Sequence, residues 1–581
     1  MSLNTQTPAA PVLVPYLDLG GGLNTRKDEH ALARNELAIS INCWPAYDNA
    51  ISKRPGSIPL ITTDGKTGNG KGTLALLACR FPSSGGQSIT WLINVTIEGS
   101  VFVAPMQGAT KWTKIGNVNP SGGVITAAQM FDPDRGKAGL QAVFICDGYS
   151  IPQVWNGPGN QLNNVMLGTS NQTSWLPTHN DGTPITPKFV HTLGNNSHLF
   201  YSGDPVEPSS VYVSDPFFPQ RFTTAAMQVN LKVKGAYQPA IIGNNDGVEG
   251  GPITGLETLG STMVVFKESA IYNMVMTTLL GEVPAWQVVQ VSNSIGNLSP
   301  RSLARFDTFV AFLGIDGVYA TDGNTAWQIS GDVPTFFDSS LNGQQAQIIN
   351  RQTAIGVRHG NRYELFFQGA SFPNTTGMWF DFTRQTSSGN PAAGQIEGMN
   401  VGGAVALRGP LDDGNVAWGN AAKDMIGKFG VSGAGDFGQS ILSMFSGKAD
   451  LFDDVMGPEA IIGQKQAQDA YVLIELQSAS PPATNLDFAG TILVDNQDSL
   501  QRVIPQIIAQ SGFGPNTWGV GQWGTMVWGN PVGIYNFAIV KIPLQNAAKG
   551  HLLQVALAEN SVVPWVIIGY VVYANLQPVG Y

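Results

Sequence analysis

The sequence predicts an all-β fold: an irregular β-propeller of about seven blades, with an N-terminal arm before it and a β-sandwich-like C-terminal domain after it. Of 581 residues, 12% are charged and 69 are glycine, a composition that disfavours helices and suits strands joined by turns. Asp-Gly and Asn-Gly pairs are frequent, and they supply the positive φ values of tight hairpins. These pairs begin at Asp64, Asp147, Asn156, Asp181, Asp246, Asp316, Asp322, Asn342 and Asp413.

The hairpins recur at similar intervals, which is the third observation behind the propeller. Apolar strand starts are separated by 47 to 64 residues, near the spacing of propeller blades with insertions. They fall at Trp91, Val143, Leu199, Met263, Val310, Tyr363 and Val416. In Val310–Tyr319, for example, an apolar strand enters, a polar turn follows and an aromatic-bearing strand returns. Such units bury both faces by stacking around an axis. A series of β-sandwiches is the alternative.

The chain divides into residues 1–60, 61–430 and 431–581. The first segment has little periodicity and is expected to be an arm that crosses the surface and ends at Lys53-Arg-Pro-Gly56, where Pro-Gly favours a type II turn. We expect this arm to supply the strand that closes the propeller, because closure removes the last exposed sheet edge. The only helices that the sequence favours are 338–351 and 498–510, and the second contains Pro505.

The C-terminal domain follows a glycine-rich linker at Gly430–Gly438. Beyond the linker the sequence predicts an antiparallel sandwich. Its expected strands are 471–476, 490–494, 534–543, 551–558 and 562–574.

Charge and cysteine content exclude several classes of protein. The formal net charge is −10, which argues against a general nucleic-acid binder. Three cysteines cannot form a disulfide framework, and we expect Cys43, Cys79 and Cys146 to be buried in a protein of a reducing compartment. The first ten residues lack the basic and apolar regions of a secretory signal. The most apolar stretch, 562–574, is too short to span a bilayer.

Two glycine-rich segments resemble nucleotide-binding motifs by letter. Gly65–Lys71 matches most of a phosphate-binding loop, but Gly72 replaces the Ser or Thr that would hold magnesium. Gly433–Gly438 matches the dinucleotide pattern without a βαβ unit around it. We therefore interpret both segments as loops and predict no cofactor.

Metal-binding and catalytic motifs are also incomplete or absent in this sequence. The histidines are scattered without zinc-ligand spacing, at His30, His179, His191, His198, His359 and His551. Asp132–Gly136 resembles a calcium loop that lacks its remaining ligands. No G-x-S-x-G motif is present. A carboxylate pair for glycoside hydrolysis, whose members meet only in space, stays open. We predict no catalytic, cofactor-binding or metal-binding residue.

Three tryptophans recur every five residues, each followed by glycine, at Trp518, Trp523 and Trp528. We interpret them as a cluster packed within its own domain. An anchor between subunits and a surface that stacks on sugars are the alternatives.

Four passages, in a consistent order over residues 19 to about 330, resemble the nozzle or hub proteins of short bacteriophage tails, a group that includes tail tubular B-like and packaged-DNA stabilisation-like proteins. The first is Leu19–Asn24 with Asn42 and Lys53–Gly56. The second is His198–Gly203 with Ser214-Asp-Pro216 and Phe222, the third Val264–Tyr272, and the fourth Phe312–Tyr319 with Ile329-Ser330. The C-terminal third matches less well.

The resemblance implies a structural virion protein, assembled in the host cytoplasm and located in the tail. It implies a ring of six copies below an adaptor ring, contacts to tail fibres, tailspikes or a needle, and a channel that genomic DNA leaves through without sequence-specific binding. The family provides no catalytic residue to carry over. From the net charge we expect the lumen of such a ring to be acidic or neutral. The alternative function is a propeller that binds or cleaves host-surface glycans.

Overall fold

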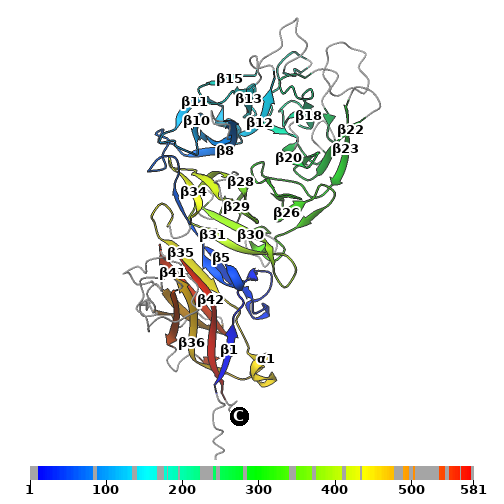
Figure 1. The fold of residues 1–581 in the computed structure, drawn as a ribbon. Helices are drawn as coiled ribbons and strands as arrows, with labels where there is room; N and C mark the ends of the chain where they lie inside the picture. Colours follow the sequence, from blue (N-terminus) through cyan, green and yellow to red (C-terminus); the bar gives the residue numbers. More distant parts are fainter. Residues whose placement is uncertain are drawn as a thin grey trace, which may run out of the picture.

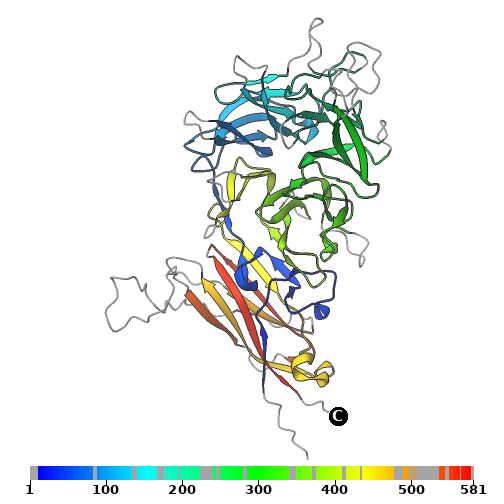
Figure 2. The ribbon, with the colours of Figure 1, turned by 45° about the vertical axis from the view of Figure 1, so that its right-hand side comes forward.

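In the computed structural model the described residues are 11–82, 88–133, 140–165, 176–179, 181–193, 197–222, 240–243, 249–278, 284–338, 348–369, 375–407, 414–431, 435–476, 488–495, 501–503, 536–543, 549–562 and 564–577. They form a propeller at one end of the molecule and a sandwich at the other (Figure 1). The blue N-terminal strands lie beside the red C-terminal strands in both views (Figure 1; Figure 2).

The propeller has seven blades among the described residues, and six of them are separate four-stranded sheets. The first blade contains β8 Thr73–Pro82, β9 Ser88–Thr96, β10 Ser100–Pro105 and β11 Thr113–Asn117. The second contains β12 Thr126–Asp132, β13 Leu140–Cys146, β14 Gln153–Trp155 and β15 Leu162–Asn164. The third contains β16 Phe189–Thr192, β17 Leu199–Ser202, β18 Ser210–Val213 and β19 Ala240–Ile241. The fourth and fifth contain β20 Ile253–Leu259, β21 Thr262–Lys267, β22 Ile271–Thr278 and β23 Pro284–Ser292; and β24 Ala304–Arg305, β25 Val310–Leu313, β26 Val318–Thr321 and β27 Ala326–Gln328.

The last two blades connect the propeller to the rest of the chain. The sixth is formed by β28 Asn350–His359, β29 Arg362–Gln368, β30 Thr376–Gln385 and β31 Pro391–Glu397, and its sheet continues into the sandwich. The seventh has the order β32-β33-β34-β7, from Val401–Ala406, Val416–Asn420, Ile426–Val431 and Gly56–Pro59. The N-terminal segment thus supplies the closing strand, as the sequence predicted.

The predicted hairpin series is confirmed, because each apolar start lies in the second strand of a different blade: β9, β13, β17, β21, β25, β29 and β33. Every residue of β17 and β25 is buried. β25 is apolar at every position and β17 at all but Ser202, because neighbouring blades cover both faces of each small sheet. The turn prediction also holds in part, since φ is positive at Gly65, Gly148, Gly157, Gly182, Gly323 and Gly414. Gly317 is not among the glycines with positive φ. The pairs at Asp246 and Asn342 lie outside the described residues.

The seam between the seventh and first blades depends on glycine. A Cβ added to Gly402 of β32 would lie 2.0 Å from the carbonyl oxygen of Thr73 in β8, and one at Gly403 would lie 2.6 Å from the backbone nitrogen of Leu76. The two inner strands therefore approach as closely as side-chain-free backbone allows. This contact closes the propeller into a complete circle.

The C-terminal domain is a sandwich of two sheets with an apolar core between them. One sheet has the order β39-β36-β42-β6-β5, with β1 also paired to β42 and β40 to β36; the other continues the sixth blade through β4-β35-β41-β37-β38. The strands predicted from the C-terminal sequence are all present, as β36 Lys465–Leu476, β37 Phe488–Val494, β39 Asn536–Pro543, β41 Leu553–Ser561 and β42 Trp565–Leu576. The shorter strands are β35 Ile441–Ser446, β38 Gln501–Val503 and β40 Lys549–Gly550.

The expectation of a surface arm is wrong for the described part of residues 1–60. This segment contributes β1 Val12–Tyr16, β2 Gly22–Leu23, β3 Glu36–Leu37, β4 Ile39–Ile41, β5 Cys43–Pro45 and β6 Ile51–Lys53. β1 pairs with Tyr570–Ala574, and Val14 and Tyr16 are buried in the sandwich core. The segment is an integral part of both bodies, because its apolar side chains complete a core that the C-terminal strands leave open.

The described helices are single turns: α1 Asp453–Met456, η1 Glu29–Ala31, η2 Tyr47–Asn49, η3 Pro120–Gly122, η5 Pro334–Phe336 and η6 Pro458–Ile461. None of them has the length and hydropathy that a bilayer-spanning helix needs. The predicted helix 338–351 is wrong at its C-terminal end, where β28 begins, and 339–347 lie outside the described residues. In 498–510, Gln501–Val503 is strand β38, and the remainder lies outside the described residues.

Candidate functional site

A cleft of about 670 Å³ lies where the seventh blade meets the sandwich. Its charged lining residues come from four separate segments: Arg54 follows β6, Glu397 ends β31, Lys423 lies in the β33–β34 turn and Asp436 lies in the linker. The lining also includes four amide side chains, from Asn42, Asn420, Gln439 and Asn560. The cleft therefore offers hydrogen-bonding groups of every kind over a partly apolar wall.

An ion pair organises one side of this cleft. The Arg54 guanidinium binds Asp436 through both terminal nitrogens and donates through Nε to Asn42 Oδ1 at 2.8 Å. Asn42 in turn donates to the carbonyl of Leu442 at 2.7 Å and accepts the backbone N–H of Glu397 at 2.9 Å. Asn42 adopts φ of 53°, a conformation that asparagine tolerates better than most residues. These bonds fasten the N-terminal segment, the sixth blade and the sandwich to one another.

Glu397 is the cleft residue with the clearest electrostatic perturbation. Burial raises its pKa above the ordinary value. Gln395 Nε2 donates to Glu397 Oε1 at 2.6 Å, an interaction available to both protonation states. A carboxyl group with a raised pKa is able to act as a proton donor nearer neutral pH than an exposed one.

The propeller axis holds a second cavity of about 330 Å³ between the seven inner strands. Arg301, just before β24, lies across it: its guanidinium donates to the carbonyls of Leu74 at 2.8 Å, Gly402 at 3.0 Å and Thr353 at 3.0 Å. These carbonyls belong to the first, seventh and sixth blades. Burial lowers the pKa of Arg301 to about 10, so the side chain stays cationic at neutral pH. Arg301 thus bridges the axis of the propeller.

The loop that matched a phosphate-binding motif holds a carboxylate of the chain itself. Asp424, in the seventh blade, accepts the backbone N–H groups of Thr67 at 2.8 Å, Gly68 at 3.0 Å and Gly70 at 2.9 Å, and the hydroxyl of Thr67 at 2.8 Å. Successive backbone N–H groups form a concavity for anions. The interpretation as a loop is confirmed, and the loop clamps the connection between β7 and β8 onto the seventh blade.

The second nucleotide-like segment is described only from Gly435. Asp436 there binds Arg54, and Phe437 adopts φ of 52° and packs its ring 5.5 Å from Trp418. Gly433 and Ala434 lie outside the described residues. The described part is a linker that packs on the seventh blade.

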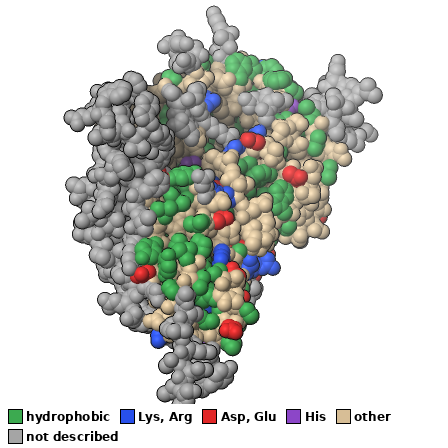
Figure 3. Space-filling model, turned by 60° about the horizontal axis from the view of Figure 1, so that its bottom comes forward, with side chains coloured by type: hydrophobic (Ala, Val, Ile, Leu, Met, Phe, Trp, Pro, Cys, Tyr) green, Lys and Arg blue, Asp and Glu red, His purple; other side chains and the backbone are tan. Residues whose placement is uncertain are grey.

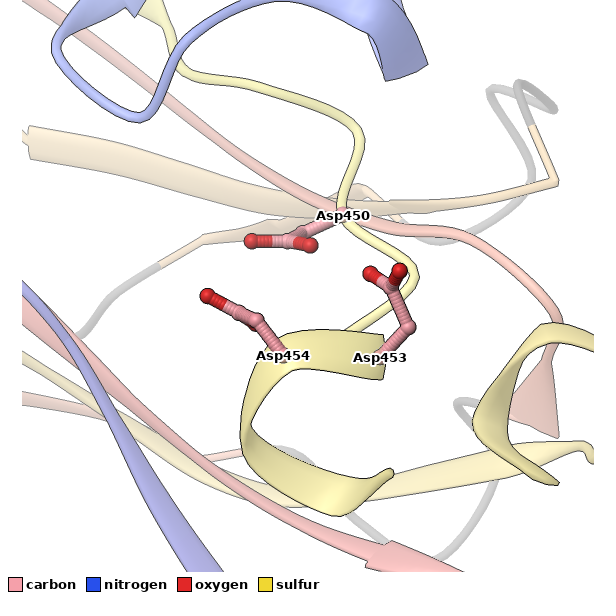
Figure 4. Close-up of side chains that lie close together, drawn as sticks. All are labelled: Asp450, Asp453 and Asp454. Carbon is pink, nitrogen blue, oxygen red and sulfur yellow. The ribbon is translucent and has the colours of Figure 1, made fainter. Parts of the chain in front are cut away.

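A carboxylate cluster that the sequence reasoning did not single out lies beside α1. The side chains of Asp450, Asp453 and Asp454 point toward one another (Figure 4), with oxygen atoms within 4.8 Å. Arg34 binds Asp450 at 3.2 Å and Asp454 at 2.5 Å, and the Tyr16 hydroxyl donates to Asp450 at 2.6 Å. The cluster therefore fixes the N-terminal segment to the sandwich, and the Asp-Asp doublet after a strand was its only sequence signal.

Four of the scattered histidines make separate contacts. His191 binds Glu257, His179 binds Asp204, His359 binds Glu364, and His198 contacts the carbonyl of Ser214. Of the calcium-like segment, Asp132 is buried and accepts from Gln220, and 134–136 lie outside the described residues. Cys43, Cys79 and Cys146 are buried free thiols, as predicted. Trp518, Trp523 and Trp528 lie outside the described residues.

The sandwich end carries exposed hydrophobic side chains (Figure 3). Leu13 and Leu17 are 45% and 60% exposed, and Ile461 and Ile462 are 50% and 68% exposed. They come from, or lie next to, β1 and η6, and both of these elements contact α1. We refer to these four residues as the sandwich-end patch.

Comparisons with known proteins assign no family to the chain. No family model and no curated protein matches. Solved structures with a related trace include dihydro-heme d1 dehydrogenase NirN, which is 9% identical over 56% of this chain and 57% of that one, with a TM-score of 0.31. PorZ of the type-IX secretion system of Porphyromonas gingivalis is 11% identical over 62% of this chain and 37% of that one, with a TM-score of 0.31. The extracellular domain of a one component system from B. thetaiotaomicron is 12% identical over 77% of this chain and 56% of that one, with a TM-score of 0.37. Each match spans less than two thirds of the other chain. At these scores the likeness supports no functional argument, and the propeller assignment rests on the sheet topology of this chain.

Proposed function

We propose that this chain is a structural subunit of a bacteriophage tail nozzle, located in the virion tail and assembled as a ring of six below an adaptor. The observation that carries the proposal is the role of the residues on which the family resemblance rests. In each of the four passages these residues bond other parts of the same chain. Bonds of this kind within the chain suit a rigid scaffold.

The contacts differ from passage to passage but serve the same purpose. Arg54 joins the N-terminal segment to the linker, and Ser214 Oγ accepts the backbone N–H of Leu199 at 2.8 Å. Lys267 Nζ is buried and donates to the carbonyls of Ile242 at 3.1 Å and Glu249 at 2.6 Å. Ser330 Oγ accepts the N–H of Val318 at 2.9 Å. Each bond fixes one hairpin or one blade against its neighbour.

The blocked propeller axis determines where DNA passes in a ring of this kind. A cavity of about 330 Å³ is too small for duplex DNA, whose major groove alone is about 12 Å wide. Together with the Arg301 bridge, this excludes threading through the propeller. The genome path in the proposed nozzle is therefore the central hole between subunits.

The exposed apolar side chains of the sandwich-end patch support contacts between chains, because exposed apolar surface is typical of interaction sites. Native mass spectrometry of the purified chain tests the ring directly. We expect a species of six times 61.7 kDa, and we expect Leu17→Asp to shift it toward smaller species. Glu98→Gln, which changes an exposed charge on the first blade, is the matched control. A chain that stays monomeric at every concentration and beside its virion partners contradicts the proposal.

Glycan binding or cleavage is the second candidate, and the cleft beside the seventh blade favours it. The cleft combines amide side chains with Glu397, whose pKa burial raises, and a protonated carboxyl is the general acid that glycoside hydrolysis needs. Incubation with host polysaccharide distinguishes the two functions. Release of reducing sugar by the native chain and its loss in Glu397→Gln would favour the enzyme over the structural role that we propose.

A further inference from the structure

The axial cavity of the propeller is lined by a cation that no carboxylate of the described residues offsets. Arg301 lines this cavity of about 330 Å³, and the three acceptors of its guanidinium are neutral backbone carbonyls. Among the described residues it forms no ion pair, and burial alone accounts for its lowered pKa of about 10. Taking a cation out of water is unfavourable unless an opposite charge lies nearby.

The Arg301 guanidinium also has more donors than acceptors within the described structure. Its Nε is buried and has no hydrogen-bond partner. Its Nη2 has two N–H groups and makes one bond, to the carbonyl of Thr353 at 3.0 Å. The side chain lines the axial cavity and keeps some accessible surface, so a solute in the cavity can reach it.

Two further charged side chains line the axial cavity, and they offset each other. Glu257 Oε1 lies 3.1 Å from His191 Nε2, and His191 Nδ1 lies 2.8 Å from the carbonyl of Thr192, so both ring nitrogens can donate, as in imidazolium. Burial lowers the pKa of His191, but the Glu257 carboxylate outweighs burial and raises it above the ordinary value. The described lining therefore has a surplus of one positive charge, at Arg301.

Most of the remaining wall of the axial cavity is aliphatic. It includes Leu74, Leu77, Leu256, Leu303, Ile355 and Val405. A third cavity, of about 310 Å³, shares His191, Glu257 and Leu303 with the axial cavity. Neither cavity is fully enclosed, so a small solute has a route to Arg301.

We propose that the axial cavity binds a short aliphatic monocarboxylate, with its carboxylate at the Arg301 guanidinium and its hydrocarbon chain against the aliphatic wall. Guanidinium donors match the planar geometry of a carboxylate, and one surplus positive charge suits a monoanion. The attraction between the two charges is stronger inside the propeller than in water. Burial of the hydrocarbon chain favours this ligand over an inorganic ion, and the volume is that of a small-molecule site.

Isothermal titration of the whole chain with sodium pentanoate tests the site, at a pH below the ordinary histidine pKa of about 6.5. We expect one saturable site per chain. Pentanamide has the same hydrocarbon chain without the charge, and sodium chloride of equal ionic strength supplies an anion without the chain. Each should bind at least ten-fold more weakly than pentanoate.

Variants of the lining locate the bound pentanoate. Arg301→Met should weaken binding at least ten-fold, whereas the matched control Arg26→Met, at an exposed site outside the propeller blades, should not change it. Leu303→Phe enlarges the wall without changing charge and should also weaken binding, which keeps the test valid where loss of Arg301 harms folding. The proposal is wrong if pentanoate does not saturate or if pentanamide or chloride binds as tightly. It is also wrong if Arg301→Met and Leu303→Phe both bind as tightly as Arg26→Met.

Discussion

Lys53 and Glu559, which are 506 residues apart in the sequence, form a buried ion pair with Nζ and Oε2 2.6 Å apart. Both side chains are almost inaccessible to solvent, and Trp565 Nε1 donates to the same carboxylate oxygen at 3.0 Å. The pair joins the segment just before the closing strand of the propeller to a central strand of the sandwich. The pair therefore links the propeller to the sandwich.

Loss of Lys53 should be strongly destabilising. Lys53→Met leaves the Glu559 charge buried without its cation, and removing one member of a buried pair costs about 3–5 kcal/mol. Urea unfolding monitored by tryptophan fluorescence measures the change. The double variant Lys53→Met, Glu559→Leu should recover most of the loss, because an apolar pair needs no desolvation. Equal destabilisation of the single and double variants would show that packing, rather than charge, matters here.

Asp424 should hold the propeller closed. Asp424→Ala removes the acceptor of three backbone N–H groups and one hydroxyl, and hydrogen bonds to charged groups contribute about 1.5–3 kcal/mol each. We expect the free energy of unfolding to fall by about 2–3 kcal/mol. Amide hydrogen exchange should accelerate in β7 and β34 before it does in other blades. Asp28→Ala, at an exposed site with no side-chain capping bond, is the control, and equal exchange in both variants would contradict the clamp.

The raised pKa of Glu397 predicts a specific pH dependence. Its folded-state pKa exceeds the ordinary value of about 4.3, so the neutral carboxyl favours folding. This contribution is fully present below the ordinary pKa and is lost as pH rises through the folded pKa. Glutamine does not ionise, so Glu397→Gln should gain stability relative to the native chain across that window. A constant difference from pH 4 to 7, in denaturant melts, would disprove the shift.

Duplex DNA should bind the proposed ring of six chains weakly. The net charge of −10 per chain favours an acidic or neutral lumen, and like charge keeps a passing polyanion off the wall within the roughly 8 Å Debye length of physiological salt. A mobility-shift assay at low salt should show little complex. Tight binding that weakens steeply as salt rises indicates rows of lysine or arginine along the lumen and contradicts this expectation.

The sequence predicted the seven blades because each contains a strand buried on both faces. Strands such as Val310–Leu313 are apolar at every position, and that signal is local. The N-terminal segment was misinterpreted because its strands have two to five residues, too few for a recognisable period, and because the partners of β1 are at Tyr570–Ala574. Pairing over such a separation leaves no trace in a single sequence.

The sites, too, are formed by residues that lie far apart in the sequence. Gly65–Lys71 was predicted to be a loop, as the structure shows, but the side chain that it binds, Asp424, is more than 350 residues away. Likewise, the cleft beside the seventh blade draws Arg54 and Asp436 from segments 382 positions apart. Residue type indicated what each group could do, and only the fold indicated which groups meet.

Electron microscopy of the virion that we propose contains this chain, with the chain located in the reconstruction, tests the proposed nozzle function most directly. We predict six copies in a ring at the distal end of a short tail, with propellers and sandwiches surrounding an axial hole and no DNA inside any propeller. The chain found as a peripheral fibre or spike, as a trimer, or absent from the particle would contradict the assignment.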